Sequence, residues 1–167
     1  DPRNARRLEL VTRSGEHLLQ LINDLLDLSR IEAGRIDLQL RPCALRRLVA
    51  ELAEQFQARA AQKGLGFDHH QPTPLPEWVL ADEHRLRQVL TNLLGNAIKF
   101  TETGEVALAA AAQPSNGAVR FEVRDTGIGI AGEDLPRIFA PFQQAASAAL
   151  AAQGAGLGLA ISERLVN

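Results

Sequence analysis

A hydrophobic stripe with helical spacing runs along the start of the chain. Its members are Leu8, Val11, Gly15, Leu18, Ile22 and Leu25 on a heptad seam, widened by Leu21, Leu26 and Leu28. The pattern predicts one long amphipathic helix over residues 2–33, which Gly34 ends. A lone helix cannot bury such a stripe, so this helix needs a partner in its own domain, in another segment or in another chain.

Past Gly34 the hydrophobic spacing changes several times between the period of a strand and that of a helix. The first predicted elements are a strand in IDLQL (36–40), a helix over 44–63, a short strand in LGFDHH (65–70) and a proline-rich surface loop in QPTPLPE (71–77). A helix follows over 82–100, with Asp82 as its N-cap. The last predicted elements are strands over 104–112 and 118–125 joined through QPSNG, a short helix near 132–138 and a helix after the glycines of 154–158. Helices and antiparallel strands in one mixed layer, without strict βαβ alternation, predict an α+β fold.

Composition narrows the class of protein. The 167 residues suffice for one ordinary core plus an appendage, and a net charge of −2 argues against a nucleic-acid-binding surface. Cys43 is the single cysteine, which fits a reducing compartment. No apolar run approaches the roughly 20 residues that cross a bilayer. The start at Asp1 and the lack of methionine favour an interior piece of a longer chain.

Gly127, Gly129 and Gly132 spell G-x-G-x-x-G after a predicted strand. A dinucleotide-binding turn also needs a helix directly at its glycines and an acidic residue about 20 positions further on. The stretch at that distance is AALAAQGAG, which has no acid and no strand pattern, and the G-x-x-x-x-G-K-[ST] phosphate loop is absent as well. The context therefore argues against both of these nucleotide motifs.

Three other features favour a different nucleotide site. Asn92, Asn96 and Lys99 fall on one helical face, which presents amide oxygens suited to Mg²⁺ and an ammonium suited to phosphate. The glycines of GAGLGL lead into a helix whose N-terminal N–H groups can bind an anion. Asp125 ends a strand and can accept a hydrogen bond from an exocyclic amine such as that of adenine. Each of these features alone is usually structural. The hypothesis of a nucleotide site rests on their occurrence together, in this order along the chain.

Four segments then resemble the motifs of one family. NLLGNAIKF, DTGIGI, IFAPFQQ and GAGLGLAIS are similar to the N box, first glycine box, F box and second glycine box of sensor histidine kinases. SGEHLLQLINDLLDLSRIEAG resembles the second helix of their dimerisation and phosphotransfer hairpin. The resemblance implies an α+β, two-layer α/β sandwich of the GHKL (Bergerat) ATP-binding type, preceded by a long coiled-coil-like helix. Residues 1–34 would be that second helix without the first, and 35–167 a C-terminally truncated catalytic ATP-binding domain.

The resemblance also implies roles for individual residues. Asn96 would hold Mg²⁺ with support from Asn92, Lys99 would touch phosphate, and Asp125 would bind the adenine amine. The remaining expected contacts with the nucleotide and its lid are Phe100, Gly127, Gly129, Ile130, Phe139, Phe142, Gly154, Gly156, Leu157 and Gly158. For both lid phenylalanines, ordinary core packing is the alternative.

The sequence departs from the family in three ways. None of His17, His69, His70 and His84 lies in a phosphoacceptor box, so the accepting histidine is expected upstream of Asp1. The segment AASAALAAQ, in the place of the lid, has no Arg or Lys, and the chain stops within the helix after the second glycine box.

The family implies transfer of the ATP γ-phosphoryl group to a histidine and then to an aspartate of a response-regulator receiver domain. It also implies a homodimer through the first helix, and a cytoplasmic location without nucleic-acid or membrane contact. A degenerate, non-catalytic signalling module and an ATPase of the same fold stay open as alternatives.

Overall fold

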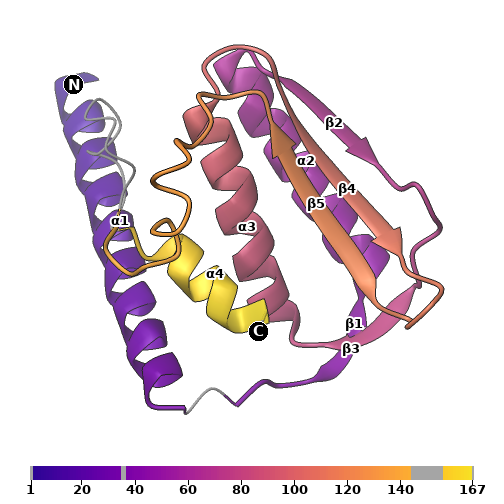
Figure 1. The fold of residues 1–167 in the computed structure, drawn as a ribbon. Helices are drawn as coiled ribbons and strands as arrows, with labels where there is room; N and C mark the ends of the chain where they lie inside the picture. The colour runs from indigo at the N-terminus through magenta and orange to yellow at the C-terminus, as the bar shows by residue number, and fades with distance from the viewer. Residues whose placement is uncertain (1, 35–36, 144–155, 167) are drawn as a thin grey trace.

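A computed structural model of the chain describes residues 2–34, 37–143 and 156–166. The elements in chain order are α1 (Pro2–Glu32), β1 (Arg41–Ala44), α2 (Leu45–Lys63), β2 (Gly66–His70), β3 (Trp78–Ala81), α3 (Glu83–Phe100), β4 (Glu105–Ala112), β5 (Val119–Asp125) and α4 (Gly158–Val166). Figure 1 shows the helices gathered on one side of the long strands, with α4 between α1 and α3.

The main sheet has three strands in the order β2-β4-β5. β2 runs parallel to β4, and β5 runs antiparallel to β4 with Val123 opposite Leu108. Helices α2 and α3 pack on this sheet, and β1 and β3 form a separate two-stranded antiparallel sheet. The α+β two-layer sandwich expected from the sequence is confirmed.

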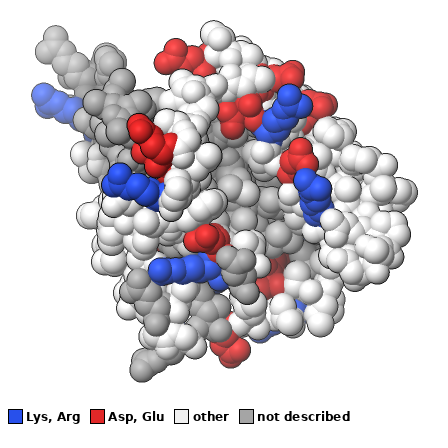
Figure 2. All heavy atoms as spheres, viewed as in Figure 1, with Lys and Arg blue, Asp and Glu red and all other residues white. Residues whose placement is uncertain are grey.

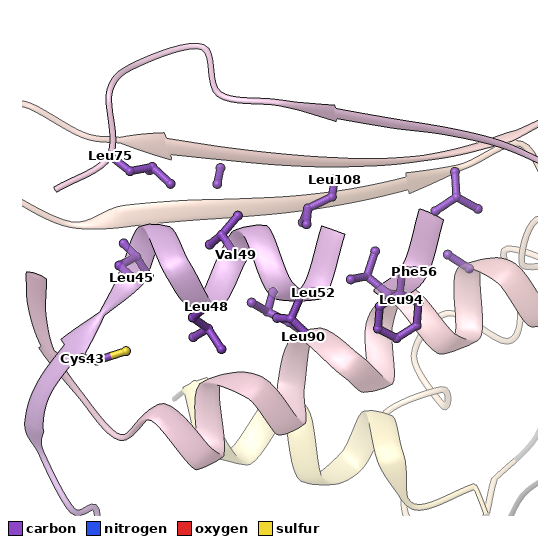
Figure 3. Close-up of a cluster of buried hydrophobic side chains, with 13 residues drawn as sticks. Cys43, Leu45, Leu48, Val49, Leu52, Phe56, Leu75, Leu90, Leu94 and Leu108 are labelled. Atoms are coloured by element: carbon purple, nitrogen blue, oxygen red, sulfur yellow. The ribbon is translucent and has the colours of Figure 1, made fainter. Parts of the chain in front are cut away.

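The core lies between α2, α3 and the main sheet. Figure 3 shows Val49 pointing from α2 toward Leu108 of the sheet, while Leu48 and Leu52 point toward α3. The buried side chains of α2 recur at helical spacing, and they are Leu45, Leu48, Val49, Leu52, Ala53, Phe56 and Ala60. Cys43 of β1 is 1% exposed at one end of this cluster.

The ends of the helices follow from local chemistry. Asp82 caps α3, because its side chain accepts a hydrogen bond from the Arg85 N–H at 3.1 Å. Gly64 adopts a left-handed conformation (φ +77°) after α2, and Gly34 does the same (φ +64°) after α1. The predicted N-cap and the predicted stop at Gly34 are both confirmed.

The stripe of α1 divides into two parts. At the C-terminal end, Leu28 is buried against Leu157 and Ile161, so this end packs on its own chain. Further toward the N-terminus, the stripe residues Leu8, Val11, Leu18, Ile22, Leu25 and Leu26 are 47–68% exposed, as is the neighbouring Leu19. Packing on its own domain therefore accounts for only one end of the stripe.

Several local predictions were wrong. Residues 37–40 of IDLQL are not a strand, and β1 begins after them at Arg41. β3 directly follows the proline-rich loop and was not predicted. β2 and β4 pair in parallel rather than antiparallel, because α3 carries the chain back before β4 starts. Residues 132–138 form consecutive turns rather than a helix.

The surface of the described residues agrees with the composition. Figure 2 shows acidic and basic side chains interspersed over the face seen in Figure 1. Within the described ranges, no helix is both long and apolar enough to pass through a bilayer.

Candidate functional site

The predicted amide face lies on the C-terminal half of α3, and α4 contacts it at Asn92. Asn92, Asn96 and Lys99 are each half-buried there. To the residues that the structure describes, the Asn96 side chain forms no hydrogen bond, which leaves its amide oxygen for a ligand. An amide oxygen is a hard donor of the kind Mg²⁺ prefers, so Asn96 fits that ion.

Asn92 connects the amide face to the second glycine box. Its Nδ2 donates to Oγ of Ser162 at 3.0 Å, and Ser162 is buried in α4. A Cβ on Gly158 would lie 2.8 Å from Cγ of Asn92, so the glycine is needed for this close approach. Ser162 was missed by the sequence analysis, although it lies four residues after Gly158, on the same side of α4.

Asp125 is the last residue of β5, and its carboxylate shapes the turn that follows. Oδ1 accepts a hydrogen bond from the Gly127 N–H at 2.9 Å, as in an Asx turn. A Cβ on Gly127 would lie 2.9 Å from the carbonyl carbon of Phe100, so the turn sits directly on the end of α3. The Asp125 side chain is exposed, so its carboxylate can also accept from a ligand.

The turn is also bonded to α3. The Ile128 N–H donates to the Phe100 carbonyl at 3.3 Å. Gly129 follows with φ +68°, a conformation that favours glycine, and Ile130 is exposed beside it. The N box and first glycine box, which the sequence could only place in order, therefore meet at one helix end.

Lys99 and Phe100 close this end of α3. Nζ of Lys99 lies 4.6 Å from the centroid of the Phe100 ring, a cation–π distance. Burial lowers the pKa of Lys99 below its usual value, because the surrounding residues of the protein remove water from the ammonium. A partly desolvated cation interacts more strongly with a phosphate than a fully hydrated one does.

The F box and second glycine box are bonded to each other. The Phe142 N–H donates to the Gly156 carbonyl at 3.0 Å, and Phe142 has φ 62°, a strained value for an aromatic residue. Phe139 and Phe142 are 40% and 62% exposed, which contradicts the alternative that they pack in the core. Both rings are therefore accessible to a ligand.

The other predicted residues of the second glycine box differ in their surroundings. Gly156 has φ +68°, and a Cβ on it would lie 2.6 Å from the carbonyl oxygen of Gln143. Leu157 is 3% exposed and packs on Leu28 of α1, so in this arrangement it faces the helix. Gly154 and the predicted lid AASAALAAQ (145–153) lie outside the described residues.

Together these residues present groups suited to the different parts of a nucleotide: an acceptor for the base and cationic or N–H groups for the phosphates. They combine an exposed carboxylate, an amide oxygen, a desolvated cation and the N-terminal end of α4. Among the described residues there is no cluster of three or more His, Cys, Asp or Glu that could hold a metal ion. A metal at this site would therefore depend on amide and phosphate oxygens, as Mg²⁺ commonly does.

Comparison with known proteins gives consistent results. Residues 81–167 match the family model of histidine kinase-, DNA gyrase B- and HSP90-like ATPases. The chain is 41% identical over 170 residues to the signal transduction histidine-protein kinase BarA of Escherichia coli K12, covering 99% of this chain and 18% of that protein. It is 44% identical over 163 residues to the virulence sensor protein BvgS of Bordetella pertussis, covering 95% of this chain and 13% of that protein.

A solved structure shares the fold. The crystal structure of full-length ShkA in complex with AMPPNP superposes with a TM-score of 0.77 at 47% identity, covering 92% of this chain and 31% of that chain. The chain thus spans less than a fifth of the two curated relatives and about a third of this structural neighbour.

Proposed function

Because the chain belongs to the family of histidine kinase-, DNA gyrase B- and HSP90-like ATPases, we propose that it is the catalytic ATP-binding part of a sensor histidine kinase. One observation carries the proposal: α3 is hydrogen-bonded to the turn after Asp125 through the Phe100 carbonyl and to α4 through the Asn92 side chain. Residues 35–167 would form the nucleotide-binding domain, and residues 1–34 would be one helix of a dimerisation and phosphotransfer hairpin. ShkA, whose structure was solved with AMPPNP, supports a nucleoside triphosphate as the ligand.

In this proposal each residue acts through position and charge. Asp125 accepts a hydrogen bond from the adenine amine, and Gly127 and Gly129 let the backbone approach the base. Lys99 and the N–H groups at the start of α4 neutralise phosphate charge. Phe100 and Ile130 wall the pocket, and Phe139 and Phe142 anchor the segment between the F box and the second glycine box.

The reaction would transfer the γ-phosphoryl group of ATP to a histidine nitrogen. Phosphoryl transfer needs mainly alignment and neutralisation of charge, which this site is built to give. Mg²⁺ held by Asn96, with Asn92 in support, would neutralise phosphate charge when bound. The accepting histidine would come from a segment outside this chain, because none of its four histidines lies in a phosphoacceptor box.

The proposal includes partners. The exposed seam of α1 would pair in a homodimer, and an aspartate of a receiver domain would take the phosphoryl group from the histidine. The site would work on the cytoplasmic side of the cell, where ATP is present. Two alternatives are a non-catalytic signalling module that lacks ATP-driven transfer, and an ATPase of the same fold.

Calorimetric titration with Mg–ATP tests the proposal. We expect micromolar binding by the wild-type chain and a loss of at least about tenfold in Asp125→Asn, because the amide loses the charge that strengthens the hydrogen bond. Glu122→Gln, an exposed change on the same strand, is the control and should bind normally. An absence of binding by the wild type would favour the non-catalytic module, and steady phosphate release without a histidine-bearing helix would favour the ATPase.

A further inference from the structure

The C-terminal end of α3 is bonded to three other parts of the chain. A helix leaves its last four carbonyls without helical partners, and each needs another donor. Here the Ala97 carbonyl accepts from the Thr101 N–H and hydroxyl, and the Phe100 carbonyl accepts from Ile128. The two carbonyls between them, of Ile98 and Lys99, both accept from one side chain.

That side chain is Lys63, from the last turn of α2. Its Nζ lies 2.6 Å from the Ile98 carbonyl oxygen and 2.9 Å from that of Lys99. Gly64 ends α2 immediately afterwards in a left-handed conformation, which sets the position from which Lys63 reaches α3. An ammonium at this end of α3 also complements the negative end of the helix dipole.

The residues that Lys63 holds are those of the proposed nucleotide site. Lys99 supplies one of the two carbonyls, Asn96 lies one turn earlier, and Phe100 carries the bond to the Asp125 turn. We propose that Lys63 is a positioning residue: it fixes the last turn of α3 so that the phosphate-side and adenine-side groups keep their spacing. This inference rests on the proposed function, because it concerns the same site.

A purely structural role would give a different result. If Lys63 only stabilised the fold, its loss would lower the melting temperature and leave nucleotide affinity unchanged well below that temperature. A positioning role acts on affinity in the folded chain, because a misplaced group weakens each contact with the ligand.

The test compares Mg–ATP affinity and melting temperature across five proteins. They are the wild type, Lys63→Met, Lys63→Arg, Arg59→Met and Leu45→Ala. Lys63→Met keeps the apolar stem and removes the donors, and Lys63→Arg keeps a cation with several donors. Arg59→Met makes the same charge change on α2, where Arg59 lies over Phe56. Leu45→Ala lowers stability from the far end of α2.

We expect Lys63→Met to bind Mg–ATP about tenfold more weakly, since it loses hydrogen bonds from a charged group, and Lys63→Arg to restore most of the affinity. Arg59→Met and Leu45→Ala should bind as the wild type does at a temperature where all five are folded. Normal binding by Lys63→Met would overturn the inference, as would equal losses in Lys63→Met and Leu45→Ala. If the wild type itself does not bind, the proposed function fails first and the inference with it.

Discussion

At Gly127 a missing side chain allows two segments to touch. A Cβ there would lie 2.9 Å from both the Phe100 carbonyl carbon and Oδ1 of Asp125, closer than such atoms normally approach. Gly132, which completes the G-x-G-x-x-G spacing, has nothing within 4 Å of the same position and no positive φ. The three glycines are therefore not one motif, because the first is required by contact and the last is not.

The two glycines predict opposite outcomes for the same substitution. Gly127→Ala should push the Asp125 turn away from α3, lowering stability by about 1–3 kcal/mol and weakening Mg–ATP binding at least about tenfold. Gly132→Ala should leave binding unchanged and raise stability by up to about 1 kcal/mol, because it restricts the unfolded chain. Calorimetric titration and thermal unfolding of both variants check this. Equal effects at the two positions would contradict the contact argument.

Between elements, a partly buried ion pair joins α1 to α3. Nη1 and Nη2 of Arg85 bind Oδ2 and Oδ1 of Asp27 at 2.6 and 3.0 Å, and Gln88 donates to the same carboxylate at 3.0 Å. Burial alone would raise the pKa of Asp27, but the hydrogen bonds from Arg85 and Gln88 outweigh it and hold the pKa below its usual range. The contact is therefore strongest with the carboxylate charged.

This pair predicts a pH dependence of the α1 contact. A lowered folded pKa contributes stability that is present above the ordinary aspartate pKa of about 3.9 and lost as pH falls through the lowered value. Asp27→Asn should cost about 1–3 kcal/mol of unfolding free energy at pH 7, and the difference from the wild type should shrink below about pH 4. Urea unfolding at both pH values measures it.

The difference in unfolding free energy between the wild type and Asp27→Asn reports Asp27 separately from the nearby Asp24. Burial raises the pKa of Asp24, so that carboxyl acts in the opposite sense, but it is present in both proteins. If the difference in unfolding free energy between the wild type and Asp27→Asn were the same at low pH, the charge of Asp27 would not be what stabilises the contact between α1 and α3.

At this scale, the sequence predicts the elements that are defined by their own residues and misses those that depend on distant segments. α2 and α3 were predictable because their own spacing and the Asp82 cap define them. β1 and β3 are four residues each and pair across 33 residues of intervening chain between Ala44 and Trp78, so no local pattern separates them from loops. The Asp27–Arg85 pair joins residues 58 apart, and only the tertiary fold brings them together.

The site shows the same division. Motif order pointed to Asn96, Lys99 and Asp125, whose chemistry is visible in the residue types. Lys63 and Ser162 contact α3 from other helices, Lys63 through two hydrogen bonds to carbonyls and Ser162 through one hydrogen bond from Asn92. In the sequence, Lys63 looks like an ordinary surface residue and Ser162 like an ordinary helix residue.

At the scale of the whole molecule, the main feature is the exposed apolar row along α1. Isolated exposed leucines are normal on a protein surface, but a continuous apolar row along a helix marks an interaction surface. Among the residues that the structure describes, the C-terminal end of α1 packs on its own chain at Leu28, while the exposed apolar side chains from Leu8 to Leu26 are open to a second copy.

We therefore expect self-association that depends on concentration. Sedimentation of the wild-type chain should show dimers or larger species at high concentration, and Leu18→Gln with Leu25→Gln should abolish them by placing amides in the apolar row. Asn23→Gln, a polar exchange away from the seam, is the control. A monomeric wild type at every concentration would contradict this expectation.

The buried thiol of Cys43 gives the molecule a built-in probe of its own fluctuations. It is the single cysteine of the chain, is 1% exposed, and has a pKa raised by burial and by Glu83 nearby. An alkylating reagent can reach this sulfur only when the structure around it opens, so the labelling rate reports that opening. Opening of the structure around β1 can thus be timed without introducing a foreign label.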